Sequence, residues 1–244
     1  MLARFTFYHC FASVQIEGKL YENGVGRIIA VGGSKGGNGK TLLASLIAPG
    51  LAQRGYRTGV IDADPNAVFS AWHATYTGPA LRCQAEARDV QVVDLAQAWA
   101  DDLDVVVIDT AGFGNLTAAA AMGCADYVLV PCMPDRGSTR EAAKTMEKVA
   151  SLARAARRAI GASVVLSQWR TGGVAEQATL EDLTDYGVTA ILKTPIPDRA
   201  AFRKMSFDGR AIVTGALGVI VDGVIDELVE LASLAKLGEI EEHA

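Results

Sequence analysis

Short runs of apolar, mostly β-branched residues recur along the chain, separated by longer amphipathic stretches. A continuous apolar run of this length is typical of a strand that is buried on both faces of a parallel sheet. We predict such strands at residues 28–31, 58–61, 90–93, 105–108, 127–131, 163–167 and 188–192. Strands buried on both faces require helices on each side of the sheet.

The stretches between these runs predict the covering helices. We expect helices at residues 41–54, 95–103, 138–159 and 218–236, with Pro49-Gly50 interrupting the last turns of the first. Strands that alternate with helices indicate an α/β fold, doubly wound, with a mostly parallel sheet flanked by helices. Ligands of such folds bind at the carboxyl ends of the strands.

Composition narrows the class of protein. The 244 residues suffice for one large α/β domain, and a net charge of −5 excludes a general affinity for polyanions. Any contact with nucleic acid therefore needs a local basic patch. The four cysteines lack metal-binding spacing, which favours free thiols in a reducing cytoplasm. No apolar run is long enough for a transmembrane helix.

A glycine-rich loop lies between the first predicted strand and the first predicted helix. Glycines let successive backbone N–H groups converge on an anion, and the start of the following helix adds partial positive charge. The P-loop pattern G-x-x-x-x-G-K-[ST] would place glycine where this chain has Ser34, so the strict motif fails by one residue. Lys40 can reach the β- and γ-phosphates of a nucleotide, and the Thr41 hydroxyl can bind Mg²⁺.

Carboxylates follow two of the predicted strands. Asp62 and Asp64 end the strand at 58–61, and Asp109 ends the strand at 105–108. Strand ends beside a phosphate-binding loop are where a nucleotide site holds Mg²⁺ and water. We therefore place these three carboxylates in the same candidate site.

Residues 35–41 read Lys-Gly-Gly-Asn-Gly-Lys-Thr, which resembles the deviant Walker A motif K-G-G-x-G-K-T of the ParA/MinD family of P-loop ATPases, closest to ParA-type partition ATPases. The resemblance covers residues 27–236, which we assign to a ParA-like ATPase domain. Residues 1–26 are then an N-terminal extension of unknown role, and residues 237–244 an acidic tail.

The resemblance implies ATP and Mg²⁺ as cofactors and assigns a role to each motif residue. Lys35 would reach the nucleotide of a partner protomer, and Asp64 would position the attacking water. Asp62 and Asp109, with Thr41, would hold Mg²⁺. The nucleotide would be bound by Gly36, Gly37, Asn38, Gly39, Lys40, Thr41, Pro195, Pro197 and Asp198. Many relatives carry an asparagine for the adenine near Ser167, and this chain lacks it.

Two clusters of basic residues are candidates for surface contacts. Arg140, Lys144 and Lys148 share one face of the helix at 138–159, which is either a solvated face or a stripe that faces DNA or a partner. The second cluster is Arg199, Arg203, Lys204 and Arg210, which is either a solvated, salt-bridged surface or a DNA-binding patch. In ParA-type ATPases, basic residues of this region bind DNA phosphates without reading sequence.

The resemblance implies a homodimer in the ATP state that partitions plasmid or chromosomal DNA with a cognate ParB-like adaptor. Such a switch would be cytoplasmic and associated with the nucleoid. The acidic C-terminal region disfavours membrane binding through a basic amphipathic helix. The alternatives are positioning of a protein cargo such as a chemoreceptor cluster, recruitment of a conjugation complex, a metabolic enzyme, or a non-enzymatic structural role.

Overall fold

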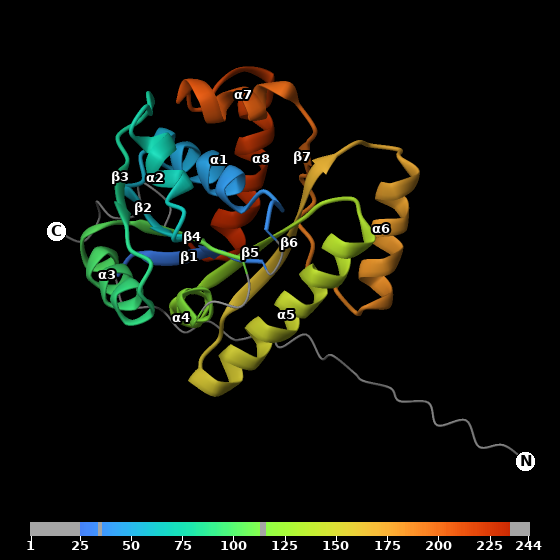
Figure 1. The fold of residues 1–244 in the computed structure, drawn as a ribbon, viewed down its shortest axis with the longest axis horizontal. Coiled ribbons are helices and arrows are strands. Elements are labelled where there is room, and N and C mark those ends of the chain that lie inside the picture. The colour runs from blue at the N-terminus through green and yellow to red at the C-terminus, as the bar shows by residue number, and fades with distance from the viewer. Residues whose placement is uncertain (1–24, 34–35, 113–115, 235–244) are drawn as a thin grey trace, which may run out of the picture.

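The computed structural model describes residues 25–33, 36–112 and 116–234. Its described residues form one sheet of seven strands, all parallel, in the order β3-β2-β4-β1-β5-β6-β7 (Figure 1). The strands are β1 Arg27–Val31, β2 Thr58–Ala63, β3 Arg82–Ala85, β4 Val105–Thr110, β5 Tyr127–Cys132, β6 Gly161–Trp169 and β7 Ile196–Pro197. The predicted α/β fold with helices on a parallel sheet is confirmed.

Helices cover both faces of this sheet. They are α1 Lys40–Gln53, α2 Val68–His73, α3 Asp89–Asp102, α4 Leu116–Cys124, α5 Arg136–Ala156, α6 Val174–Asp185, α7 Ala200–Asp208 and α8 Gly215–Leu231. Alternate strand residues point to opposite faces, so Ile29 packs with α1, α2, α7 and α8. Ile28 packs instead with α3, α4, α5 and α6. None of the described helices is long and apolar enough to cross a membrane.

Residues 90–93 do not form the predicted strand. They lie in α3, where Val92, Ala96, Trp99 and Ala100 are buried at the three- and four-residue spacing of a helix. The neighbouring edge strand is β3, which we did not predict, because its sequence Arg-Cys-Gln-Ala has no apolar run and three of its four residues are exposed.

The last predicted strand is also wrong. Within residues 188–192 only an isolated bridge forms, between Ile191 and Val164. The strand that ends the sheet is β7, whose two residues follow Pro195. Proline has no N–H to donate to a ladder, so this edge of the sheet is short.

Helix α1 runs unbroken through Pro49-Gly50, contrary to our expectation. Both residues are buried where α1 meets α8, and a Cβ added at Gly50 would lie 2.3 Å from Cδ1 of Ile225. Glycine therefore allows the two helices to approach closely. Packing against α8 offsets the backbone hydrogen bond that Pro49 cannot make.

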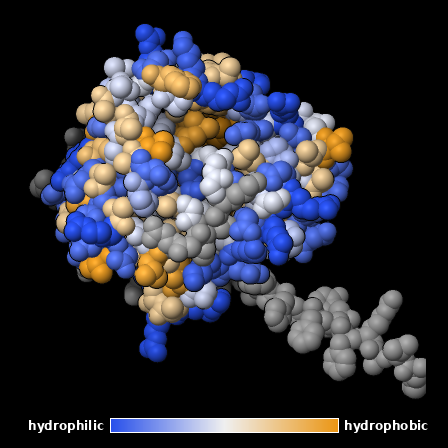
Figure 2. All heavy atoms as spheres, in the orientation of Figure 1, coloured by the Kyte–Doolittle hydropathy of each residue, from blue (hydrophilic) through white to orange (hydrophobic). Residues whose placement is uncertain are grey.

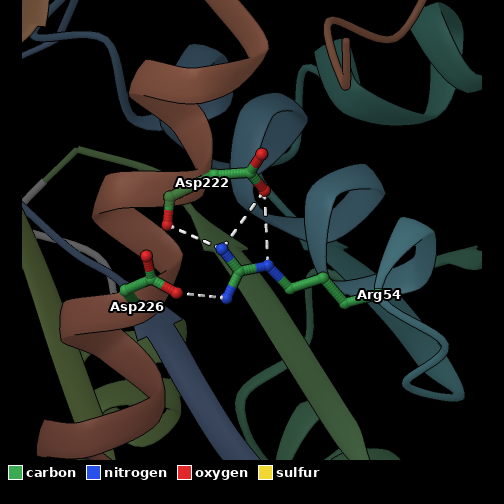
Figure 3. Close-up of polar contacts among 3 residues, drawn as sticks. All are labelled: Arg54, Asp222 and Asp226. Atoms are coloured by element: carbon green, nitrogen blue, oxygen red, sulfur yellow. Dashed lines mark hydrogen bonds and ion pairs between the residues drawn. The ribbon is translucent and has the colours of Figure 1, made fainter.

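A charged cluster fastens the end of α1 to α8 (Figure 3). The Arg54 guanidinium donates to Oδ1 of Asp222 from Nε and Nη2, at 3.3 and 3.2 Å, and to the Asp222 carbonyl oxygen at 2.8 Å. Its Nη1 donates to Oδ1 of Asp226 at 2.7 Å. Burial disfavours the charged guanidinium, but the two carboxylates outweigh burial and raise the pKa of Arg54. The phosphate-loop helix is thus anchored at its far end.

Candidate nucleotide-binding site

The glycine-rich loop connects β1 to α1 at the centre of the sheet. Gly37 and Gly39 have φ angles of 80° and 85°, which L side chains rarely adopt, and a Cβ at either position would meet no atom within 4 Å. The glycines are therefore required by the backbone path of the loop rather than by close packing. Ser34 and Lys35 lie outside the described residues.

Lys40 begins α1 and is only 6% exposed. Burial lowers the pKa of its ammonium, and the nearby carboxylates of Asp109 and Asp64 oppose this shift. Thr41 follows it, half-buried, in the first turn of the same helix. The structure therefore brings the lysine of the loop together with two of the three predicted carboxylates.

Asp109 ends β4 in register with Asp62 on β2. It is fully buried, and neither of its carboxylate oxygens has a hydrogen-bond partner among the described residues. Burial raises the pKa of Asp109 to about 7; the charges of Asp62 and Asp64 add to the shift, while Thr41 and Lys40 oppose it.

Two orphaned carboxylate oxygens are costly in a protein interior. A divalent cation would satisfy both, and oxygen ligands are what Mg²⁺ prefers. The residues at this strand end therefore fit a Mg²⁺ site in which Asp109 and Thr41 face the ion.

Both carboxylate oxygens of Asp62 accept hydrogen bonds from described residues, unlike those of Asp109. Its Oδ1 accepts from the Asp64 N–H at 3.3 Å, and its Oδ2 accepts from the Ser70 N–H at 2.7 Å, in the first turn of α2. The Asp64 carboxylate accepts both the backbone N–H and the side-chain amide of Asn66 at 2.9 Å. Asp62 thus holds the loop after β2 and the start of α2 in place, a role that the sequence analysis did not assign.

The loop is also linked to the start of α5. Asn38 is 2% exposed, and its side-chain oxygen lies 3.3 Å from the Ser138 hydroxyl oxygen. Asp135 caps α5 by accepting from the Ser138 N–H at 2.9 Å and from its hydroxyl at 2.6 Å. The sequence analysis missed Asp135 and Ser138, although an aspartate just before a helix is a common N-cap residue.

The predicted adenine loop lies at the end of β7. The Asp198 N–H donates to the Trp169 carbonyl at 3.2 Å, so the loop is attached to the end of β6. The Asp198 carboxylate accepts from Arg170 at 2.7 Å and from Arg203 at 2.6 Å, and these two cations lower its pKa. Pro195 and Pro197 flank the strand residue Ile196, and both are half-buried.

The second basic cluster lies on and around α7, and several of its charges are already paired. Arg203 is bound to Asp198, and Arg199 donates to the Asp198 carbonyl at 3.2 Å. Lys204 lies 3.9 Å from the Asp208 carboxylate. Arg210 is exposed just beyond the helix. Of these four residues, Arg203 and Lys204 lie near carboxylates, whereas Arg199 and Arg210 have no acidic partner among the described residues.

An apolar hollow of about 460 Å³ opens between α1, α2 and α7. Its hydrophobic floor is visible near the top of Figure 2, below α7. Trp72 helps to define it, because its indole N–H donates to the Met205 carbonyl at 2.8 Å and ties α2 to α7. The lining residues are Thr41, Leu42, Ser45, Val68, Ala71, Trp72, Thr75, Met205, Ser206 and Phe207. Thr41 belongs both to the candidate site and to the lining of this hollow.

A parallel sheet with a glycine loop after β1 and carboxylates after β2 and β4 defines the P-loop nucleotide-binding class. Residues 27–217 match the family described as VirC1 protein. The chain is 30% identical over 192 residues to the maintenance of carboxysome distribution protein A of Halothiobacillus neapolitanus, covering 75% of this chain and 85% of that protein.

A second relative is the protein ParA of Rhizobium radiobacter, which is 25% identical over 178 residues, covering 72% of this chain and 80% of that protein. Among solved structures, a McdA variant from Cyanothece in complex with ATP superposes with a TM-score of 0.72 at 14% identity, covering 88% of this chain and 99% of that one. The chain belongs to the VirC1 family, within the ParA/MinD group of P-loop ATPases. The predicted resemblance is confirmed.

Proposed function

We propose that this chain is an ATP-dependent switch that binds ATP with Mg²⁺, dimerises in that state and hydrolyses ATP to ADP and phosphate. The observation that carries the proposal is the Asp109 carboxylate, which is buried beside Lys40 and Thr41 with no hydrogen-bond partner among the residues that the structure describes. A protein that uses its fold only for support gains nothing from burying an unsatisfied carboxylate at this strand end.

Each residue of the site has a separate task in this switch. Bound Mg²⁺ would supply positive charge that stabilises charge developing on the phosphates. Lys40 donates to the same phosphates, and Asp64 holds and orients the attacking water. Lys35 of each protomer would reach the nucleotide of the other, so that ATP favours the dimer by adding contacts that only the dimer makes.

We further propose that the switch segregates plasmid or chromosomal DNA, binding it without sequence preference in the ATP state, together with a ParB-like adaptor protein. The likeness to ParA of Rhizobium radiobacter supports this role. The protein would then reside in the cytoplasm, on the nucleoid. A second candidate is the positioning of a protein cargo, which is supported by the 30% identity to a carboxysome distribution protein.

Replacing Lys40 with Ala tests the nucleotide site. Loss of a charge-assisted hydrogen bond of about 1.5–3 kcal/mol should weaken binding of a fluorescent ATP analogue about 10- to 150-fold. Arg57→Ala is the control, because Arg57 is exposed and lies just before β2, at the opposite end of the strands from the loop. Unchanged affinity in the Lys40 variant would refute the phosphate-loop assignment.

Co-sedimentation with random-sequence DNA then distinguishes DNA partitioning from positioning of a protein cargo. ATP-dependent co-sedimentation supports DNA partitioning. ATP-driven dimerisation with no DNA binding in any nucleotide state supports positioning of a protein cargo.

A further inference from the structure

Helix α5 and the turn that follows it concentrate positive charge on an acidic protein. Residues 136–158 contain seven basic and two acidic side chains, a net charge of +5. The whole chain carries −5, so the rest of the molecule carries −10. Charge separation on this scale gives one surface a potential opposite in sign to that of the rest of the protein.

The basic residues of α5 lie on the side away from the sheet. The helix buries Ala142, Ala143, Thr145 and Val149 against its neighbours. The exposed basic row consists of Arg136, Arg140, Lys144, Lys148 and Arg154. Arg136, Arg140, Lys144 and Lys148 keep a four-residue spacing, which places each beside the next on the helix surface, whereas Arg154 follows six residues later. The exposed Glu147 lies on the same face as Lys144. From Arg136 to Arg154 the helix extends for about 27 Å at 1.5 Å per residue. In Figure 1 α5 is the long rod at the lower right, and the surface around it in Figure 2 is mainly hydrophilic.

Much of this charge is uncompensated. Arg140 and Arg154 have no acidic partner among the described residues, and Arg136 lies 3.9 Å from Asp182 with its side chain 91% exposed. Lys144 pairs with Glu141 at 2.7 Å, but the pair is exposed to solvent and therefore weak. At α7, Arg203 pairs with Asp198 at 2.6 Å, and the arginine side chain of that pair is also exposed.

The chemistry of the row favours phosphates over a protein surface. Protein interfaces are centred on buried aromatic or aliphatic anchors. None of the large exposed hydrophobic side chains of the described residues lies on α5. A straight row of cations without such an anchor matches the backbone of a nucleic acid, where affinity comes from neutralised phosphates.

We propose that α5 is the surface through which this switch contacts the phosphates of DNA, an inference that rests on the DNA binding of the proposed function. The contact between Ser138 and Asn38 connects the first turn of α5 to the phosphate loop. Through this buried polar contact, a change in the loop on nucleotide binding can reach the start of the basic row.

The test compares two charge-removal variants in DNA binding followed by fluorescence anisotropy, with a 60-base-pair random duplex and ATP, ADP or no nucleotide. One variant is Arg140→Ala/Lys144→Ala on α5, and the other is Arg203→Ala/Lys204→Ala on α7. Arg140→Lys/Lys144→Arg keeps both charges and is the matched control. ATP binding and thermal unfolding of each variant establish that the fold and the nucleotide site are intact.

Each lost phosphate contact should reduce the slope of log K against log salt concentration by about 0.9. The α5 variant should therefore lose about 1.8 from that slope and up to about 60-fold in affinity at 0.1 M salt, whereas the charge-preserving control should bind normally. Unchanged binding by the α5 variant, with loss in the α7 variant, would overturn the inference and leave the proposed function standing.

Absence of DNA binding by the unaltered protein in every nucleotide state would overturn both the inference and the DNA role. If the unaltered protein then bound polyglutamate through Arg140 and Lys144, the surface would belong to an acidic protein partner.

Discussion

The buried carboxylate of Asp109 should make the protein less stable as the pH rises, when nucleotide and divalent cations are absent. The folded state holds the pKa of Asp109 at about 7, above the ordinary value of 3.8. Between these two values the folded state binds more protons than the unfolded state, so the free energy of unfolding falls as pH increases. The stabilisation is fully present below pH 3.8 and is lost as pH rises through 7.

The size of the effect follows from the shift in pKa. A difference of about three units corresponds to about 4 kcal/mol in total, of which about 3 kcal/mol should be lost between pH 5 and pH 8. Asp109→Asn has a similar shape and no titrating proton. The difference between the two proteins in free energy of unfolding should therefore change with pH by that amount.

Urea unfolding in EDTA at pH 5, 6, 7 and 8 measures both curves. Titrating groups far from the site contribute equally to the two proteins, so the difference reports Asp109 together with Lys40, whose pKa its charge affects. Adding Mg²⁺ at pH 8 should then stabilise the unaltered protein and leave Asp109→Asn unchanged. Parallel curves across the pH range, with no response to Mg²⁺ in either protein, would refute both the burial argument and the metal assignment.

Two further predictions concern the packing of α1 against α8. Gly50→Ala places a Cβ 2.3 Å from Cδ1 of Ile225 and should cost about 1–3 kcal/mol in urea unfolding, while adding Ile225→Val, which removes that methyl, should recover part of the loss. A cost as large in the double variant would mean that crowding at Ile225 is not the cause. Arg54→Ala removes hydrogen bonds to both carboxylates of α8 and should cost about 1–2 kcal/mol, against less than about 1 kcal/mol for the exposed Arg57→Ala. Equal losses in these two variants would contradict the anchoring role of Arg54.

The central strands and the phosphate loop could be predicted because their signals are local. Continuous burial on both faces leaves an apolar run in β1, β4 and β5, and the loop carries its own pattern of glycines and lysine. An edge strand has no such constraint, and β3 was missed because its residues face solvent. Residues 90–93 were wrongly predicted as a strand because a short apolar run does not reveal its period, which becomes visible only when Ala96 and Trp99 are included.

Contacts between distant segments could not be predicted from the chain alone. The contact between Ser138 and Asn38 joins residues one hundred positions apart, and the pairing of Arg203 with Asp198 depends on how α7 leaves β7. The sequence shows which residues are charged. Only the fold shows that Arg203 of α7 pairs with Asp198 and that Arg140 of α5 has no acidic partner among the described residues.

The two outer strands of the sheet have a consequence for how copies of this protein can associate. Open sheet edges can recruit strands from other chains, and charge, prolines and short length prevent this. Here β3 carries Arg82, whose guanidinium lies 4.0 Å from the Trp99 ring centroid, and β7 is two residues long and includes Pro197. Neither edge offers a long apolar ladder to a neighbouring chain. Fibre-like growth through the sheet edges is thereby disfavoured, which leaves the strand ends and helical faces for the ATP-dependent dimer that we propose.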